Sequence, residues 1–119
     1  MGARVVIVDD HRDVAVAVDY ALRALGHEVI IARDAEEALR AVIQHNPDLV
    51  LIDLVMPIVD GWELARSIRA LDLSRQPRLV AVSGYASRED RERSSAAGFE
   101  EHLAKPIGVA DLERLLPAN

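Results

Sequence analysis

Short apolar runs alternate with longer segments of helical periodicity along the whole chain. The runs are continuous and do not alternate with polar residues, a pattern typical of strands that are covered on both faces. Five such runs are present, at Val5–Val8, Val29–Ala32, Leu49–Ile52, Leu79–Val82 and, more weakly, His102–Ala104. We therefore expect five buried strands.

The segments between these runs carry apolar residues three or four positions apart, as amphipathic helices do. The first apolar stripe ends before Gly26, a stop signal, and consists of Val14, Val18, Leu22 and Leu25. A pair that resembles a capping box, Asp34 with Glu37, predicts where the second helix begins. The remaining helices are expected after Gly61, between Ser87 and Gly98, and around 112–116.

Alternating strands and helices with short connections predict an α/β domain, in which a parallel sheet has helices on both faces and right-handed crossovers. We see no linker, low-complexity tract or repeat, so residues 1–119 are expected to form one domain. The fourth helix is unusual, because the segment between Ser87 and Gly98 contains no large apolar residue. It is either a solvated surface helix or a part of the domain that moves easily.

Composition narrows the classes of function. The chain has 119 residues, is 50% hydrophobic with few aromatics, and contains no cysteine, which excludes disulfides and thiolate sites. No apolar run approaches the ~20 residues that cross a bilayer, so we expect a cytoplasmic protein without a membrane segment. The net charge of −6 argues against direct nucleic-acid binding, and no glycine-rich nucleotide motif is present.

Polar residues follow four of the five runs. These residues are Asp9 and Asp10, Asp53, Ser83, and Lys105. Ligands of open α/β sheets bind beyond the carboxyl ends of the strands, so the five side chains are expected to converge there.

The chemistry of this set favours a phosphoryl group. Three neighbouring carboxylates repel one another, and Mg²⁺ is the natural counter-ion for a site with only oxygen ligands. A lysine and a serine hydroxyl suit phosphoryl oxygens, and a carboxylate can become an aspartyl phosphate. Because that transfer depends mainly on positioning and charge neutralisation, the sequence predicts a phosphoryl acceptor.

The chain resembles the receiver domains of two-component response regulators, because four of its fragments occur in that family's order and at that family's spacing. They are VVIVDD (5–10), IDLVMPIVDG (52–61), AVSGYA (81–86) and HLAKP (102–106), and the resemblance extends from Val5 to Leu116. It implies a doubly wound, flavodoxin-like (βα)5 domain whose five-stranded parallel sheet has the order 2-1-3-4-5.

The resemblance also implies a role for each site residue. Asp53 would be phosphorylated, Asp10 would bind Mg²⁺ directly, and Asp9 would act mainly through water. The backbone carbonyl of Val55 would be a further metal ligand, and the Ser83 hydroxyl would turn toward the phosphoryl group. Lys105 would be the lysine of the motif, and the Lys105–Pro106 bond would be cis.

One position departs from the family pattern. The family usually has Tyr or Phe three residues before the lysine, as a rotating switch side chain, and this chain has His102. A histidine there resembles the receivers of hybrid sensor histidine kinases. The sequence leaves open whether the chain stands alone or is a module of such a kinase.

The resemblance implies a signalling domain that accepts a phosphoryl group from a phosphohistidine on a histidine kinase or a histidine phosphotransfer protein. It would assist its own phosphorylation and dephosphorylation without being a turnover enzyme. Its changing surface, and a face for dimerisation, would comprise the segments 87–98, 102–104 and 112–116. The alternatives are a small Mg²⁺-dependent phosphohydrolase and a pseudo-receiver that binds partners without phosphorylation.

Overall fold

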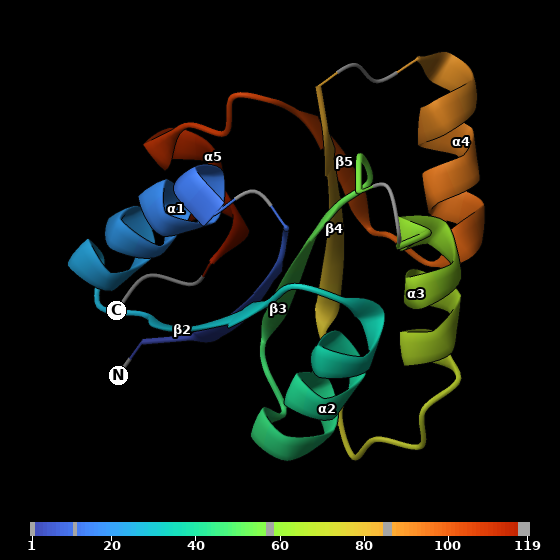
Figure 1. Ribbon diagram of the computed structural model, residues 1–119, viewed down its shortest axis with the longest axis horizontal. Helices are drawn as coiled ribbons and strands as arrows, with labels where there is room; N and C mark the ends of the chain where they lie inside the picture. The colour runs from blue at the N-terminus through green and yellow to red at the C-terminus, as the bar shows by residue number, and fades with distance from the viewer. Residues whose placement is uncertain (1, 11, 57–58, 85–86, 117–119) are drawn as a thin grey trace.

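The structure, a computed structural model, describes residues 2–10, 12–56, 59–84 and 87–116, except for the side chains of residues 12–14. Five parallel strands form one sheet in the order β2-β1-β3-β4-β5, as expected (Figure 1). The strands are β1 (Arg4–Val8), β2 (Glu28–Ala32), β3 (Leu49–Asp53), β4 (Arg78–Ser83) and β5 (Glu101–Ala104). The helices are α1 (Arg12–Ala24), α2 (Ala35–His45), α3 (Gly61–Arg69), α4 (Arg88–Ala97) and α5 (Val109–Leu115).

Two strands are longer at their carboxyl ends than the apolar pattern predicts. Asp53 pairs with Val82, and Ser83 pairs with Ala104, so both polar residues are the last members of their strands. Backbone pairing continues past the point where the side chains stop being apolar. The two side chains are therefore fixed by the sheet and do not belong to loops.

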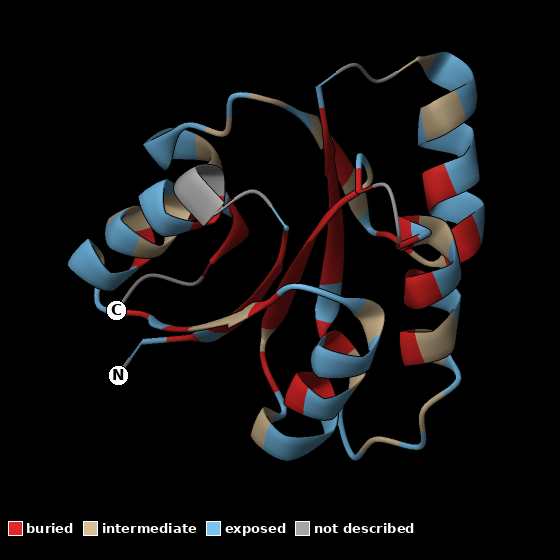
Figure 2. Cartoon of the chain, viewed as in Figure 1, coloured by how far each residue is buried: buried red, intermediate tan, exposed pale blue. Residues whose placement is uncertain are grey.

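The sheet separates two aliphatic cores. Alternate residues of a strand point to opposite faces. On one face Val50 and Ile52 pack with α2, α3 and α4, and on the other Leu49 and Leu51 pack with α1 and α5. Figure 2 shows the central strands buried along most of their length. This double cover explains why the strands are continuous apolar runs.

The helix ends agree with the expected signals, with one correction. Gly26 follows α1 with a left-handed φ of 90°. The Asp34 side chain accepts from the Glu37 backbone N–H, but the Glu37 carboxylate accepts from the backbone N–H of Arg33, one residue before the cap. Asp34 and Glu37 therefore cap α2 without forming the reciprocal capping box that the sequence suggested.

Helix α4 is held by few apolar contacts. Its buried residues are Ser94 and Ala97, and its start is fixed by a capping box between Ser87 and Asp90. Arg91 adds a side-chain bond to the backbone carbonyl of His102 in β5, 3.0 Å long. The sparse packing expected from the sequence is thus confirmed.

The described part of the chain contains no helix of the length and apolarity that a bilayer crossing requires.

Candidate functional site

Three carboxylates meet at the carboxyl edge of the sheet. β1 and β3 are neighbours with Val8 opposite Ile52, so the residues that follow both positions lie at one level. One carboxylate oxygen from each of Asp9, Asp10 and Asp53 lies within 4.8 Å of the other two. Asp53 is only 3% exposed and Asp9 is also buried, whereas Asp10 is exposed to solvent. The sequence prediction that these three side chains converge is correct.

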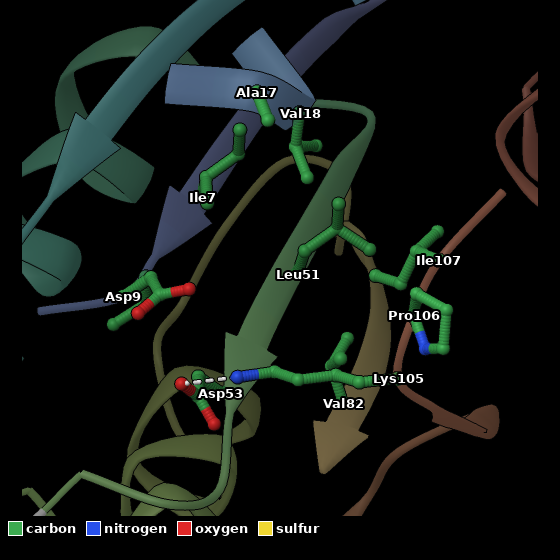
Figure 3. Close-up of a pocket in the computed structure, with 11 residues that line it drawn as sticks. Ile7, Asp9, Ala17, Val18, Leu51, Asp53, Val82, Lys105, Pro106 and Ile107 are labelled. Carbon is green, nitrogen blue, oxygen red and sulfur yellow. Dashed lines mark hydrogen bonds and ion pairs between the residues drawn. The ribbon is translucent and has the colours of Figure 1, made fainter. Parts of the chain in front are cut away.

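Lys105 completes the charge arrangement. Its ammonium Nζ donates to Asp53 Oδ2 over 3.0 Å, the dashed line in Figure 3. The backbone N–H of Lys105 donates to the carbonyl of Ser83, which continues the β4–β5 pairing to the edge of the site. The bond from Lys105 to Pro106 is cis, as the resemblance implied. A positive charge thus lies against the buried carboxylate.

The second oxygen of Asp53 is held by the following loop. Asp53 Oδ1 accepts from the backbone N–H of Val55 over 2.8 Å, and the N–H of Leu54 donates to the carbonyl of Val82. The loop is pressed against the start of α3, where a Cβ on Gly61 would lie 2.6 Å from Leu54 Cδ2. These contacts fix the direction of the Asp53 carboxylate.

The donor set fits a hard divalent cation. Every candidate ligand is a carboxylate oxygen, and no softer nitrogen or sulfur ligand belongs to the described cluster. Mg²⁺ prefers oxygen ligands and is usually held by one or two carboxylates with several waters. The carbonyl of Val55 remains a predicted additional ligand.

A mostly apolar cavity of about 570 Å³ adjoins the charged groups. Asp9, Asp53 and Lys105 lie toward one end of it, and Ile7 with Val18 lies toward the other (Figure 3). Apolar surroundings lower the local dielectric constant and thereby strengthen electrostatic interactions between the charged groups. The sequence pattern did not predict this cavity, because it depends on how α1 and the segment before α5 sit over the sheet.

Ser83, which follows the residue that pairs with Asp53, is hydrogen-bonded to His102 in β5. Ser83 Oγ and His102 Nε2 are 2.8 Å apart, and His102 Nδ1 is 2.9 Å from Ser94 Oγ in α4. The indole N–H of Trp62 in α3 donates to the same Ser94 oxygen. Sequence reasoning missed Ser94 and Trp62, because no spacing rule joins residues 32 positions apart in different helices.

The pKa of His102 is lowered in the folded chain. Burial is the main cause, since it disfavours the charged imidazolium, and the positive charge of Arg91 adds to it. The Asp90 carboxylate and backbone carbonyl oppose these effects in part. His102 is therefore a neutral imidazole at neutral pH.

Two other histidines were interpreted from the sequence. The position of His27 beside a loop predicts a surface residue, but the side chain is buried, and its Nδ1 accepts from the backbone N–H of Ala3 over 2.9 Å. It is drawn inward because this nitrogen satisfies a buried donor beside β1. His11 follows the acidic pair directly, which predicts a loop residue near the pocket mouth, and it lies outside the described residues.

Sequence comparison finds a matching family model and relatives that share about a third of their residues with this chain. The family model for the response regulator receiver domain matches residues 5–116. The transcriptional regulatory protein PrrA of Mycobacterium bovis is 36% identical over 109 residues, which is 92% of this chain and 46% of that protein. The virulence sensor protein BvgS of Bordetella pertussis is 36% identical over 118 residues, 95% of this chain and 10% of that protein. The chain thus spans less than half the length of these two relatives.

The chain is also similar in structure to the receiver domain of sensor histidine kinase PA1611 from Pseudomonas aeruginosa, which has been solved by crystallography. It has a TM-score of 0.85 and 31% sequence identity, and the match covers 97% of this chain and 94% of that one. That crystal structure has a magnesium ion coordinated in its active site cleft. The arrangement of strands and helices is therefore one that solved receiver domains share.

Proposed function

This chain belongs to the response regulator receiver domain family of two-component systems, and we propose that it accepts a phosphoryl group on Asp53 from a phosphohistidine. The donor would be a histidine kinase or a histidine phosphotransfer protein. The observation that carries the proposal is the buried Asp53 carboxylate, which lies against Lys105 and within 4.8 Å of the Asp9 and Asp10 ligand oxygens.

In the proposed step, an oxygen of Asp53 attacks the phosphorus, and the P–N bond of the phosphohistidine breaks as the new P–O bond forms. The donor imidazole leaves with the electron pair of the broken bond. Lys105 Nζ, now 3.0 Å from Asp53 Oδ2, donates to a phosphoryl oxygen. The backbone N–H of Val55 holds the other carboxylate oxygen and limits the directions in which Asp53 can turn.

Asp9 and Asp10 would hold Mg²⁺ together with Asp53. The bound cation would neutralise charge on the carboxylates and on the phosphoryl oxygens. The donor set supports this assignment, as does the magnesium ion in the receiver domain of PA1611. Without a cation, the incoming phosphoryl group would meet two further negative charges.

Phosphorylation replaces the single negative charge of the Asp53 carboxylate with a phosphoryl group that carries about two beside Lys105 and Ser83, and we expect it to bias the domain between two conformations. Helix α4 is the element to respond, because it buries few side chains and is joined to the site through His102. Similarity to the receiver domain of sensor histidine kinase PA1611 supports a role as a module of a longer kinase chain.

The direct test is phosphorylation by a small donor. The native chain, incubated with Mg²⁺ and acetyl phosphate, should gain the mass of one phosphoryl group in an intact-mass measurement. Asp53→Asn should gain none, whereas Asp72→Asn, which alters an exposed carboxylate between α3 and β4, should behave as the native chain does.

Two outcomes would contradict the proposal. The first is no phosphoryl gain by the native chain from either acetyl phosphate or a phosphorylated histidine phosphotransfer protein. The second is continuous hydrolysis of a soluble phosphate ester that is lost in Asp53→Asn, which would favour the phosphohydrolase alternative.

A further inference from the structure

A chain of hydrogen bonds leads from the end of β4 into two helices. Ser83 Oγ lies 2.8 Å from His102 Nε2, His102 Nδ1 lies 2.9 Å from Ser94 Oγ, and the Trp62 indole nitrogen lies 3.0 Å from Ser94 Oγ. His102 is 6% exposed and Ser94 is 1% exposed, so bulk water does not replace these bonds. Ser83 follows Val82, the residue that pairs with Asp53, so one end of the chain lies beside the proposed phosphoacceptor.

The number of protons restricts this chain to two arrangements. An indole N–H only donates, so Ser94 Oγ accepts from Trp62, and a neutral imidazole has one N–H. If His102 carries its proton on Nδ1, it donates to Ser94, and Ser83 donates its own proton to Nε2. If the proton is on Nε2, His102 donates to Ser83, Ser94 donates to Nδ1, and the Ser83 proton turns to another acceptor.

In the first arrangement Ser83 donates its proton to His102 Nε2 across the 2.8 Å between them. His102 Nδ1 then donates to Ser94 Oγ over 2.9 Å, and Ser94 accepts from both His102 and Trp62. We assign this arrangement to the domain before phosphorylation.

We propose that His102 is a positioning residue whose tautomer determines whether Ser83 donates its proton to the imidazole or to a phosphoryl group on Asp53. The proposal rests on the proposed function of Asp53. Phosphoryl oxygens only accept, so a phosphoryl group at the site selects the tautomer with the proton on Nε2. Ser94 must then reverse from acceptor to donor toward His102, and the change reaches α4 while His102 stays buried.

Proton balance is maintained throughout. The imidazole carries one proton in both arrangements, and each serine keeps its own. The change relocates the imidazole proton from Nδ1 to Nε2 by exchange with water and rotates two hydroxyl groups. A rotating aromatic switch, as the family resemblance implied for this position, would require His102 to break both of its serine bonds.

Nitrogen-15 spectra of the histidine rings test the proposal in the full chain. The native chain would be labelled at histidine and recorded at neutral pH with Mg²⁺, before and after addition of beryllofluoride, a phosphoryl mimic. We expect His102 to change from the Nδ1–H to the Nε2–H tautomer. His27 is an internal reference, because its Nδ1 accepts from Ala3 and its proton must stay on Nε2. In Asp53→Asn, His102 should keep the Nδ1–H tautomer.

A kinetic comparison separates positioning from a purely structural role. His102→Phe keeps a ring but loses both bonds, and we expect phosphorylation by acetyl phosphate to slow about fivefold, the effect of one lost hydrogen bond. His102→Gln retains a donor that reaches Ser83 and should recover most of the rate. Ser94→Ala removes the donor that the Nε2–H tautomer needs at Nδ1, so it should abolish the tautomer change and slow phosphorylation about as much as His102→Phe does.

The outcomes distinguish this proposal from the proposed function. If beryllofluoride shifts the backbone signals around Asp53 and the His102 tautomer stays the same, the relay is wrong and the phosphoacceptor stands. An Nε2–H tautomer before any addition would overturn the relay as well. If neither beryllofluoride nor acetyl phosphate acts on Asp53, the proposed function fails and the relay falls with it.

Discussion

The Asp53 carboxylate accepts from two donors of different kinds, the Lys105 ammonium at Oδ2 and the Val55 backbone N–H at Oδ1. An ammonium and a bound cation at this site would repel each other across a few ångströms. The carboxylate could hold both only because Asp9 and Asp10 add negative charge. From this geometry we expect Lys105 to favour the phosphoryl group and to weaken cation binding.

The opposite effects of the Lys105 charge on a bound cation and on a phosphoryl group give a prediction for Lys105→Met. Removing the positive charge should tighten Mg²⁺ binding by about threefold to tenfold, since a like charge near the cation is lost. It should also slow phosphorylation by acetyl phosphate, because a donor to the phosphoryl oxygens is gone. Calorimetric Mg²⁺ titration and the rate of mass gain measure the two effects. Arg88→Met, at a highly exposed position of α4, is the matched control and should change neither.

The buried imidazole predicts a pH dependence of stability. The pKa of His102 is lowered by burial and by Arg91, with Asp90 opposing in part, so the unfolded chain binds the proton more readily than the folded chain does. Stability should therefore be fully present above the ordinary histidine pKa of about 6.5 and should fall as the pH drops below it. Urea unfolding at a series of pH values should show a steeper loss for the native chain than for His102→Gln. Equal slopes would contradict the assignment.

At the scale of elements, the start of α3 supports the loop that carries Val55. Gly61 approaches Leu54 so closely that a Cβ would lie 2.6 Å from Leu54 Cδ2 and 3.2 Å from Ile52 Cγ2. Gly61→Ala should cost about 1–3 kcal/mol of unfolding free energy and should weaken Mg²⁺ binding by displacing the loop. Gly84→Ala is the control, because its Cβ would meet no described atom within 4 Å. Equal stabilities of the two variants would contradict this account.

Helix α4 gives a second prediction at this scale. Its buried residues are Ser94 and Ala97, whereas α3 buries Leu64, Ala65 and Ile68. Amide hydrogen exchange should therefore be faster in α4 than in α3, because less apolar burial opposes local opening. Addition of beryllofluoride with Mg²⁺ should change exchange in α4 and leave α3 nearly unaltered. No change in α4 would contradict a switch that involves this helix.

The elements show what a sequence can reveal and where it fails. Continuous apolar runs predicted all five strands, most clearly β1, β3 and β4, which are buried on both faces, and least clearly β5, which is only partly buried. The predicted ends of β3 and β4 were one residue short, since backbone pairing at Asp53 and Ser83 does not require an apolar side chain. The bond between Trp62 and Ser94 was missed, because it depends on how α3 packs against α4.

At the scale of the whole molecule, the parallel sheet brings distant residues to one edge. Asp9, Asp53 and Lys105 are spread over most of the chain, yet their strands end at the same level. The sequence predicted this convergence because the carboxyl ends of parallel strands share an edge. It could not predict the cavity beside them, whose shape depends on the packing of α1 and of the segment before α5.

The central claim is that Asp53 carries the phosphoryl group. Borohydride reduces an aspartyl phosphate to homoserine and leaves unmodified carboxylates intact, so it marks the acceptor permanently. After treatment with acetyl phosphate, Mg²⁺ and borohydride, peptide mass mapping should find homoserine at position 53, and none when Mg²⁺ is removed with a chelator. Homoserine at Asp9 or Asp10, or a phosphoryl group on a serine or histidine with residue 53 unchanged, would contradict the account.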